Sequence, residues 1–236
     1  MQGVHVMTRF TRRGLVALAT AVVPFLMLAP PAAAATAGAL WHMDESTGPL
    51  AHDSSGNGND GMLFNVTLGR PGFVGSGFGF NGTDSKIVVQ SSSSLNPGAQ
   101  DFSYTAAVRL TVVPGVGDTY DVLRKGISST TGGEYKMEVA NVKGAARARC
   151  LAKDAAGHVA KVTHSKSLAD GQWHVITCSR SGNAWSTTVD GVVKSGIVSL
   201  GSVSNSKVLT IGSKNGGKTG GDFYRGDLDE AAVSIG

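Results

Sequence analysis

From residue 36 onward the sequence alternates between short apolar runs and glycine-rich turns, and this pattern argues against a helical fold. In Phe102–Val112 an apolar side chain occupies every second position, which is the period of a strand with one buried face. Turns such as Ser55–Gly61 and Lys214–Gly221 are rich in residues that accept positive φ. Glycine supplies 33 of the 236 residues, about twice its usual share. No amphipathic helical window of useful length occurs, so we expect an all-β chain.

The strands that this alternation predicts are short and spread along the whole chain. No repeat, linker or block of charge divides them, and about a dozen strands spaced in this way are typical of a β-sandwich or jelly roll. We therefore expect one domain, built as a two-sheet antiparallel β-sandwich. The predicted strands are Leu40–Met43, Ile87–Gln90, Phe102–Val112, Tyr135–Val139, Ala146–Ala152, His158–Thr163, Trp173–Ser179, Ala184–Asp190, Val208–Ile211 and Leu228–Ile235.

The first 35 residues predict a secretory signal peptide. Arg9, Arg12 and Arg13 form a positively charged start, Gly14–Leu28 is largely apolar, and prolines and alanines lead to a cleavage point after Ala35. A membrane anchor is the alternative, but the apolar stretch is short and ends in proline and small residues. The arginine pair also resembles a twin-arginine signal. Because paired arginines are common in ordinary signals, we expect export by the general secretory route.

Removing residues 1–35 changes what the net charge implies. The segment contains three Arg and no acidic residue, so the formal charge falls from +4 to +1 in residues 36–236. No basic stripe interleaved with aromatic residues occurs, so we expect no nucleic-acid partner. A domain of this length buries a sizeable core without needing a metal. We expect a secreted, extracellular monomer that has no membrane segment once the signal is removed.

The two cysteines, Cys150 and Cys178, predict one disulfide. In an exported chain a pair of cysteines indicates a disulfide, and neither lies in a C-x-x-C motif of the redox or zinc type. The runs Ala146–Cys150 and His174–Cys178 alternate in the same way, so both sulfur atoms can face the same interior.

Seven short motifs of aromatic, acidic and glycine residues stand in order along the chain. They are Trp41–Glu45, Asp53–Gly61, Gly77–Gly82, Asp170–Val175, Val189–Gly191, Leu209–Gly212 and Phe223–Glu230. From about Leu40 to Ile235, their order and spacing resemble the laminin-G-like (LamG) domain of the concanavalin A-like lectin/glucanase superfamily. The resemblance implies a concanavalin A-like jelly roll, often with a calcium ion, that binds carbohydrate or proteins. It implies no single ligand, because the fold carries lectins, adhesion modules and hydrolases.

Four carboxylates near the ends of this domain are candidate calcium ligands. Glu45 and Asp229 share the parity of the apolar residues in their strands, and an inward carboxylate is costly unless it is paired or bound to a cation. The resemblance places the terminal strands side by side, so these two carboxylates would converge. Asp44, Asp53 and carbonyl oxygens of the 55–59 loop would then complete an oxygen shell for a structural calcium ion. The alternative is that amides of the glycine-rich loop cap the carboxylates.

The acidic residues do not match a glycoside hydrolase. Retaining enzymes hold two carboxyl groups about 5–5.5 Å apart, and related laminarinases and lichenases place theirs on one strand as Glu-x-Asp-x-x-Glu. Glu134 and Glu138 share one face of a predicted strand, but their Cα atoms would be about 13 Å apart. We expect a non-catalytic protein, with a hydrolase whose acidic pair is unrecognised as the alternative.

These arguments together predict a secreted binding module for an extracellular glycan, a polysaccharide. The alternative is an adhesion module that binds a cell-surface protein. Sugars stack on aromatic rings, and their hydroxyls bond to planar polar groups. Tyr120, in the expected Gly115–Asp121 loop, is the leading contact because its neighbours are polar; the alternative is a turn tyrosine that covers the sandwich edge. The candidate ligand-binding residues are Tyr120, Asp121, Arg124, Tyr135 and Asn215.

Overall fold

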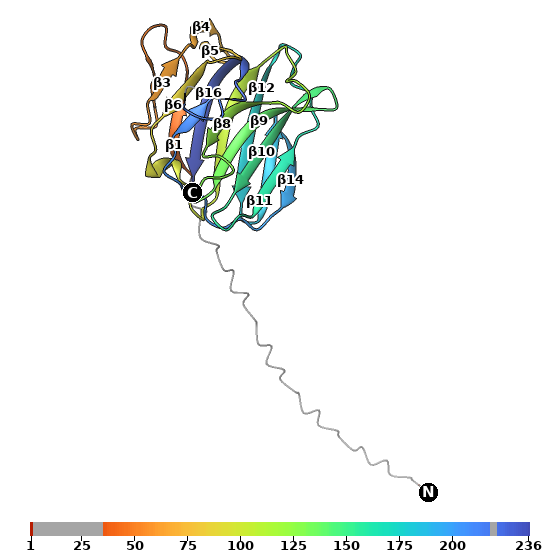
Figure 1. The fold of residues 1–236 in the computed structure, drawn as a ribbon. Coiled ribbons are helices and arrows are strands. Elements are labelled where there is room, and N and C mark those ends of the chain that lie inside the picture. The colour runs from red at the N-terminus through yellow and green to blue at the C-terminus, as the bar shows by residue number, and fades with distance from the viewer. Residues whose placement is uncertain (2–34, 218–220) are drawn as a thin grey trace. The chain divides into compact units, whose positions relative to one another are not determined.

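Two antiparallel β-sheets face each other across a hydrophobic core (Figure 1). The structure is a computed structural model and describes Met1, residues 35–217 and residues 221–236. Apart from Met1 and Ala35, the predicted signal peptide lies outside the described residues, and the first strand begins at Thr36. Within residues 35–217 and 221–236, no helix is long and apolar enough to cross a membrane.

Sheet A has the strand order β14–β13–β12–β7–β16–β5–β4, and β1 also pairs with β16. One side of β16 is hydrogen-bonded to β7, and its other side is bonded first to β5 and then to β1. The strands are β1 (Thr36–Trp41), β4 (Thr67–Pro71), β5 (Ser76–Asn81), β7 (Phe102–Arg109), β12 (Trp173–Ser181), β13 (Ala184–Val189), β14 (Val192–Ile197) and β16 (Arg225–Ile235).

Sheet B has the strand order β11–β10–β9–β8–β15–β6–β3–β2. A single 3-10 turn, Ser93–Leu95, follows β6 in the described chain. The strands are β2 (Leu50–Ala51), β3 (Gly61–Phe64), β6 (Lys86–Val89), β8 (Thr119–Lys125), β9 (Glu134–Val142), β10 (Ala145–Lys153), β11 (Val159–Thr163) and β15 (Leu209–Ile211).

The prediction of an all-β, two-sheet antiparallel sandwich is confirmed, and each predicted strand overlaps an observed one. The expected loop Gly115–Asp121 is wrong at its end, because Thr119, Tyr120 and Asp121 belong to β8. A register shift between Asp121 and Leu123 interrupts its pairing with β9. The shift disturbs the alternation of apolar and polar side chains by which strands are recognised in a sequence. Period-two alternation in the sequence therefore does not indicate this strand.

Aromatic residues from both sheets form the centre of the core. The rings of Tyr104 and Tyr135 lie 5.1 Å apart, and Trp185 packs 6.3 Å from Tyr104. The Tyr104 hydroxyl donates to the Lys136 carbonyl at 2.9 Å, and the Tyr135 hydroxyl donates to the Leu95 carbonyl at 3.0 Å. Both buried hydroxyls are thus paired, which allows these large amphipathic side chains to fill the interior.

A disulfide joins the two sheets, and the predicted pairing of Cys150 with Cys178 is confirmed. Cys150 lies on β10 of sheet B and Cys178 on β12 of sheet A, with their Cα atoms 5.4 Å apart. Trp185 strengthens the same junction, because its indole nitrogen donates to the Cys150 carbonyl at 3.1 Å. The disulfide is therefore a covalent link across the core.

Replacing both cysteines by alanine should lower the free energy of unfolding by about 3–4 kcal/mol, because the disulfide closes a loop of 28 residues in the unfolded chain. Guanidinium titration of the natural protein and of the Cys150→Ala/Cys178→Ala variant measures this difference. Equal unfolding midpoints and slopes would contradict a stabilising role.

Candidate functional site

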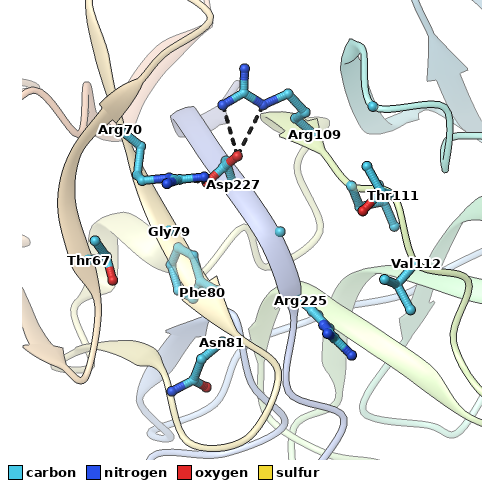
Figure 2. Close-up of a pocket in the computed structure, with 13 residues that line it drawn as sticks. Thr67, Arg70, Gly79, Phe80, Asn81, Arg109, Thr111, Val112, Arg225 and Asp227 are labelled. Atoms are coloured by element: carbon cyan, nitrogen blue, oxygen red, sulfur yellow. Dashed lines mark hydrogen bonds and ion pairs between the residues drawn. The ribbon is translucent and has the colours of Figure 1, made fainter.

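An open cleft on the outer face of sheet A is the candidate functional site. It crosses β4, β5, β16 and the end of β7, and its volume is about 510 Å³ (Figure 2). The polar side chains that line it are Thr67, Arg70, Asn81, Arg109, Thr111, Arg225 and Asp227. Strands from three separate parts of the sequence, the β4–β5 pair, β7 and β16, therefore contribute to one surface.

A glycine at an outward position of β5 forms part of the floor of the cleft and lets the Arg70 side chain lie close to the strand. Phe78 and Phe80 point into the core, so the alternation turns Gly79 outward, where it lies opposite Asp227 of β16. A Cβ atom at Gly79 would approach the Arg70 side chain to 3.3 Å. The same Cβ atom would lie 3.4 Å from Cβ of Thr67, so a larger side chain at Gly79 would displace the Arg70 stem and Thr67.

One carboxylate holds two arginines at one end of the cleft. Arg70 donates from Nε to Asp227 Oδ1 at 3.0 Å, while Arg109 donates from Nε and Nη2 to Oδ2 at 3.0 and 2.9 Å (Figure 2). The Arg109 guanidinium also lies over the Trp173 ring, 4.8 Å from its centre, which fixes its plane. Two guanidinium groups share a single negative charge, so this end of the cleft is positively charged.

Arg225 lies further along the same strand as Asp227 and is exposed. Figure 2 shows its guanidinium turned away from Asp227. Among the residues that the structure describes, no carboxylate lies within ion-pair distance of Arg225. Its aliphatic stem passes over Gly82, where a Cβ atom would approach it to 2.8 Å. The guanidinium is thus held at the cleft without a described acidic partner.

Tyr120 lies near Arg225, at the end of a short run of aromatic rings. Its ring contacts Tyr224 edge-on at 6.1 Å, and Tyr224 contacts Phe80 of the cleft at 6.0 Å. Burial raises the pKa of Tyr120, while the charge of nearby Arg225 acts in the opposite direction. The expectation that Tyr120 lacks an apolar partner is wrong, since Tyr224 packs against it. A ligand contact at this half-buried ring stays a prediction.

The other predicted ligand residues do not join this site. Asp121 and Tyr135 are 0% exposed and Arg124 is 4% exposed, so the prediction of ligand contacts at these three is wrong. Arg124 Nη1 lies 2.9 Å from Asp121 Oδ2, yet burial outweighs that attraction and raises the pKa of Asp121 to about 7. Asn215 lines a separate cleft of about 470 Å³. The five residues therefore do not form one site.

The sequence reasoning missed the charged residues that do line the cleft: Arg70, Arg109, Arg225 and Asp227. One signal could have indicated Arg109. The outward positions of its strand are otherwise small or hydroxyl side chains, so a single arginine there departs from the pattern. Its partner Asp227 lies 118 positions away, and no local pattern connects the two.

Two of the four predicted calcium ligands hold the turn between β4 and β5. Asp229 Oδ2 accepts hydrogen bonds from the amides of Phe73 at 2.7 Å and Val74 at 3.0 Å. Asp44 Oδ1 accepts one from the amide of Ser76 at 2.7 Å. These carboxylates are therefore already bonded to backbone donors.

The other two predicted ligands bond to backbone amides of the 45–59 region and of β1. Glu45 accepts from the amide of His52 at 2.7 Å, and Asp53 accepts from the amides of Leu40 and Asn59 at 2.9 Å. Across residues 35–217 and 221–236, no three acidic, histidine or cysteine side chains are grouped as they would be around a metal ion. These bonds favour the alternative in which amides cap the carboxylates, while Oε2 of Glu45 is buried without a hydrogen-bond partner among the described residues.

Comparisons with known proteins agree with the fold. The sequence model of a family described as the concanavalin A-like lectin/glucanases superfamily, Laminin_G_3, matches residues 81–234. No curated protein matches the chain. Similar solved structures are 13–16% identical to this chain, and at that identity they show a similar fold and nothing more.

Three solved structures illustrate this likeness. The binding domain of Paraclostridial Mosquitocidal Protein 1 has a TM-score of 0.62 and 16% identity, over 84% of this chain and 48% of that one. The botulinum neurotoxin serotype D binding domain has a TM-score of 0.61 and 13% identity, over 84% of this chain and 47% of that one. Domain 4 of AbnA, a GH43 extracellular arabinanase from Geobacillus stearothermophilus, was solved with arabinotriose. It has a TM-score of 0.60 and 15% identity, over 86% of this chain and 93% of that one. This chain spans about half the length of the two toxin domains.

Because amides already bond to these carboxylates, we expect the melting temperature to be the same in calcium and in chelator. Asp229→Ala should lower the free energy of unfolding by about 1–3 kcal/mol, since it leaves two partly buried amides without an acceptor. Calorimetry of the natural protein and the variant measures both effects, and Asp118→Ala, at an exposed carboxylate, is the control. A chelator-induced drop in melting temperature that Asp229→Asn abolishes would instead support calcium binding.

Proposed function

This chain belongs to the concanavalin A-like lectin/glucanase superfamily, and from that premise we propose that it is an exported, non-catalytic module that binds a polysaccharide in the cleft of sheet A. Export follows from the predicted signal peptide. Structurally similar domains have been solved with arabinotriose and with SialylT, which supports a glycan ligand. Another was solved with rat synaptotagmin II, so a protein is the second kind of partner to test.

The observation that carries the proposal is the fixed arrangement of Arg70, Asp227 and Arg109. Neighbouring hydroxyls of a sugar accept and donate pairs of hydrogen bonds, which suits a carboxylate flanked by planar guanidinium groups. The ion pairs and the Trp173 ring hold these groups in place before a ligand arrives, so little ordering entropy is lost on binding. Thr67 and Thr111 add hydroxyls at the rims.

The shape of the cleft suits a chain rather than a small enclosed molecule. It is open to solvent and runs across several strands, so a polysaccharide can lie along it with its ends outside. Open sites of this kind bind through a few contacts on each sugar unit and hold ligands weakly. Multiple contacts along one polymer then raise the overall strength of binding.

The carboxylates of the cleft support binding without hydrolysis. Asp227 is the one carboxylate that lines it among the described residues, whereas glycoside hydrolysis uses two. Glu138 is buried in ion pairs with Lys136 and Arg149, and Glu134 is buried beside Arg124. These glutamates are therefore occupied and inaccessible.

We expect the natural protein to be retarded in native gels that contain a polysaccharide, and Gly79→Val to weaken this retention about tenfold by displacing the Arg70 side chain from its place in the cleft. Ser186→Val places the same side chain on the outer face of β13, outside the cleft, and should leave retention unchanged. Tyr120→Ala should weaken retention if its ring stacks on a sugar.

The gels should contain β-glucan, xylan, arabinan, chitin, mannan and acidic polysaccharides in turn. Absence of retention on every polymer would contradict the proposal and favour a protein partner. Release of reducing sugar would contradict the non-catalytic assignment. Equal loss of retention in Gly79→Val and Ser186→Val would show that the cleft is not the binding site.

A further inference from the structure

We propose that the cleft of sheet A selects polysaccharides that carry anionic groups, carboxylate or sulfate, and that Arg225 binds the anion. This inference rests on the proposed function and names the class of polysaccharide. It is carried by the charge of the cleft lining, by the hydrogen bonds that its arginines have already made, and by the contrast with the rest of the same face.

The lining carries three arginines and one carboxylate. A neutral polysaccharide needs no such excess of positive charge, because hydroxyls and amides suffice to bond its hydroxyl groups. Guanidinium groups match carboxylate and sulfate oxygens in a planar, two-bonded geometry, and these charge-assisted bonds are stronger than neutral ones. The excess charge therefore favours an anionic group on the ligand.

The three arginines differ in how many of their guanidinium nitrogen atoms are already hydrogen-bonded within the protein. Arg109 uses Nε and Nη2 on Asp227, and Nη2 also on the Pro71 carbonyl. Arg70 uses only Nε on Asp227, and its side chain is 50% exposed. Arg225 has no described acidic partner at all. Arg225 and the outer edge of Arg70 are thus the groups available to an anion.

A large part of the outer face of sheet A beyond the cleft carries hydroxyl side chains. Ser234, Ser103, Ser179 and Ser186 lie in register across four strands, β16, β7, β12 and β13. Thr105 and Thr177 form a second row beside them and share a hydrogen bond of 3.0 Å. The arginines at the cleft therefore stand apart from a neutral hydroxyl surface, as expected for a local binding site rather than a charged face.

The test compares matched acidic and neutral polymers. Polygalacturonate and alginate supply carboxylates, dextran sulfate supplies sulfates, and unsubstituted dextran and xylan are the neutral controls. We expect stronger retention of the natural protein on at least one acidic series, with the difference falling as salt is raised. Whichever acidic series binds identifies the anion.

Substitution of Arg225 tests the assignment of the anion contact. Arg225→Gln should weaken binding to the acidic polymer about tenfold, through loss of one charge-assisted contact. Arg225→Lys, which keeps the charge but not the planar fork, should give an intermediate value. Lys161→Gln removes the same charge from an exposed position of β11 and should change nothing. Thermal melting confirms that each variant is folded.

The outcomes separate this inference from the proposed function. Equal binding of acidic and neutral polymers, unchanged by Arg225→Gln, would overturn the anion selectivity and leave the polysaccharide-binding function standing. Binding to no polysaccharide would overturn the proposed function itself. Equal loss of binding in Arg225→Gln and Lys161→Gln, together with retention on DNA, would show non-specific charge attraction and overturn the inference.

Discussion

The pairing of β16 is the interaction on which the rest of sheet A depends. This strand bonds to β7 along one side, while its other side bonds to β5 through residues 225–228 and to β1 through residues 231–235. The register of β16 against β7 shifts between Asp229 and Ala232, where β16 passes from one of these partners to the other. There the buried Asp229 carboxylate accepts hydrogen bonds from amides of the turn before β5. One strand therefore both closes the sandwich with β1 and brings Asp227 and Arg225 beside β5 to form the cleft.

The protein treats buried and exposed charges differently, and this contrast distinguishes the cleft. Arg124 lies in the buried interior of sheet B between Asp121 and Glu134. The ammonium of Lys125 is buried too and donates to one hydroxyl and two carbonyl oxygens, and burial lowers its pKa to about 8. Buried charges without such partners would be costly. Arg225, by contrast, faces solvent without a described acidic partner, as suits a group that awaits a ligand.

The likeness to solved domains supplies the architecture, and the chain's own side chains supply the chemistry. At 13–16% identity, the similar structures share the sandwich and need not share any site residue. The cleft depends on particular residues of this chain, above all on Gly79, over which the Arg70 stem lies, and on Asp227, which holds Arg70 and Arg109.

The sequence by itself determined most of the longer strands, including β7, β9, β10, β12 and β16 but not β8, and that Cys150 and Cys178 form a disulfide. It did so because strand alternation and cysteine pairing are local or compositional signals. Only the tertiary structure decided which strands are neighbours. Alternation reports the face of a residue but not its register against a distant strand. Arg70 and Asp227 are 157 positions apart, so their contact exists only once β5 lies between β4 and β16. For the same reason Tyr135, a plausible surface ring in the sequence, is a core residue whose hydroxyl bonds to the carbonyl of Leu95.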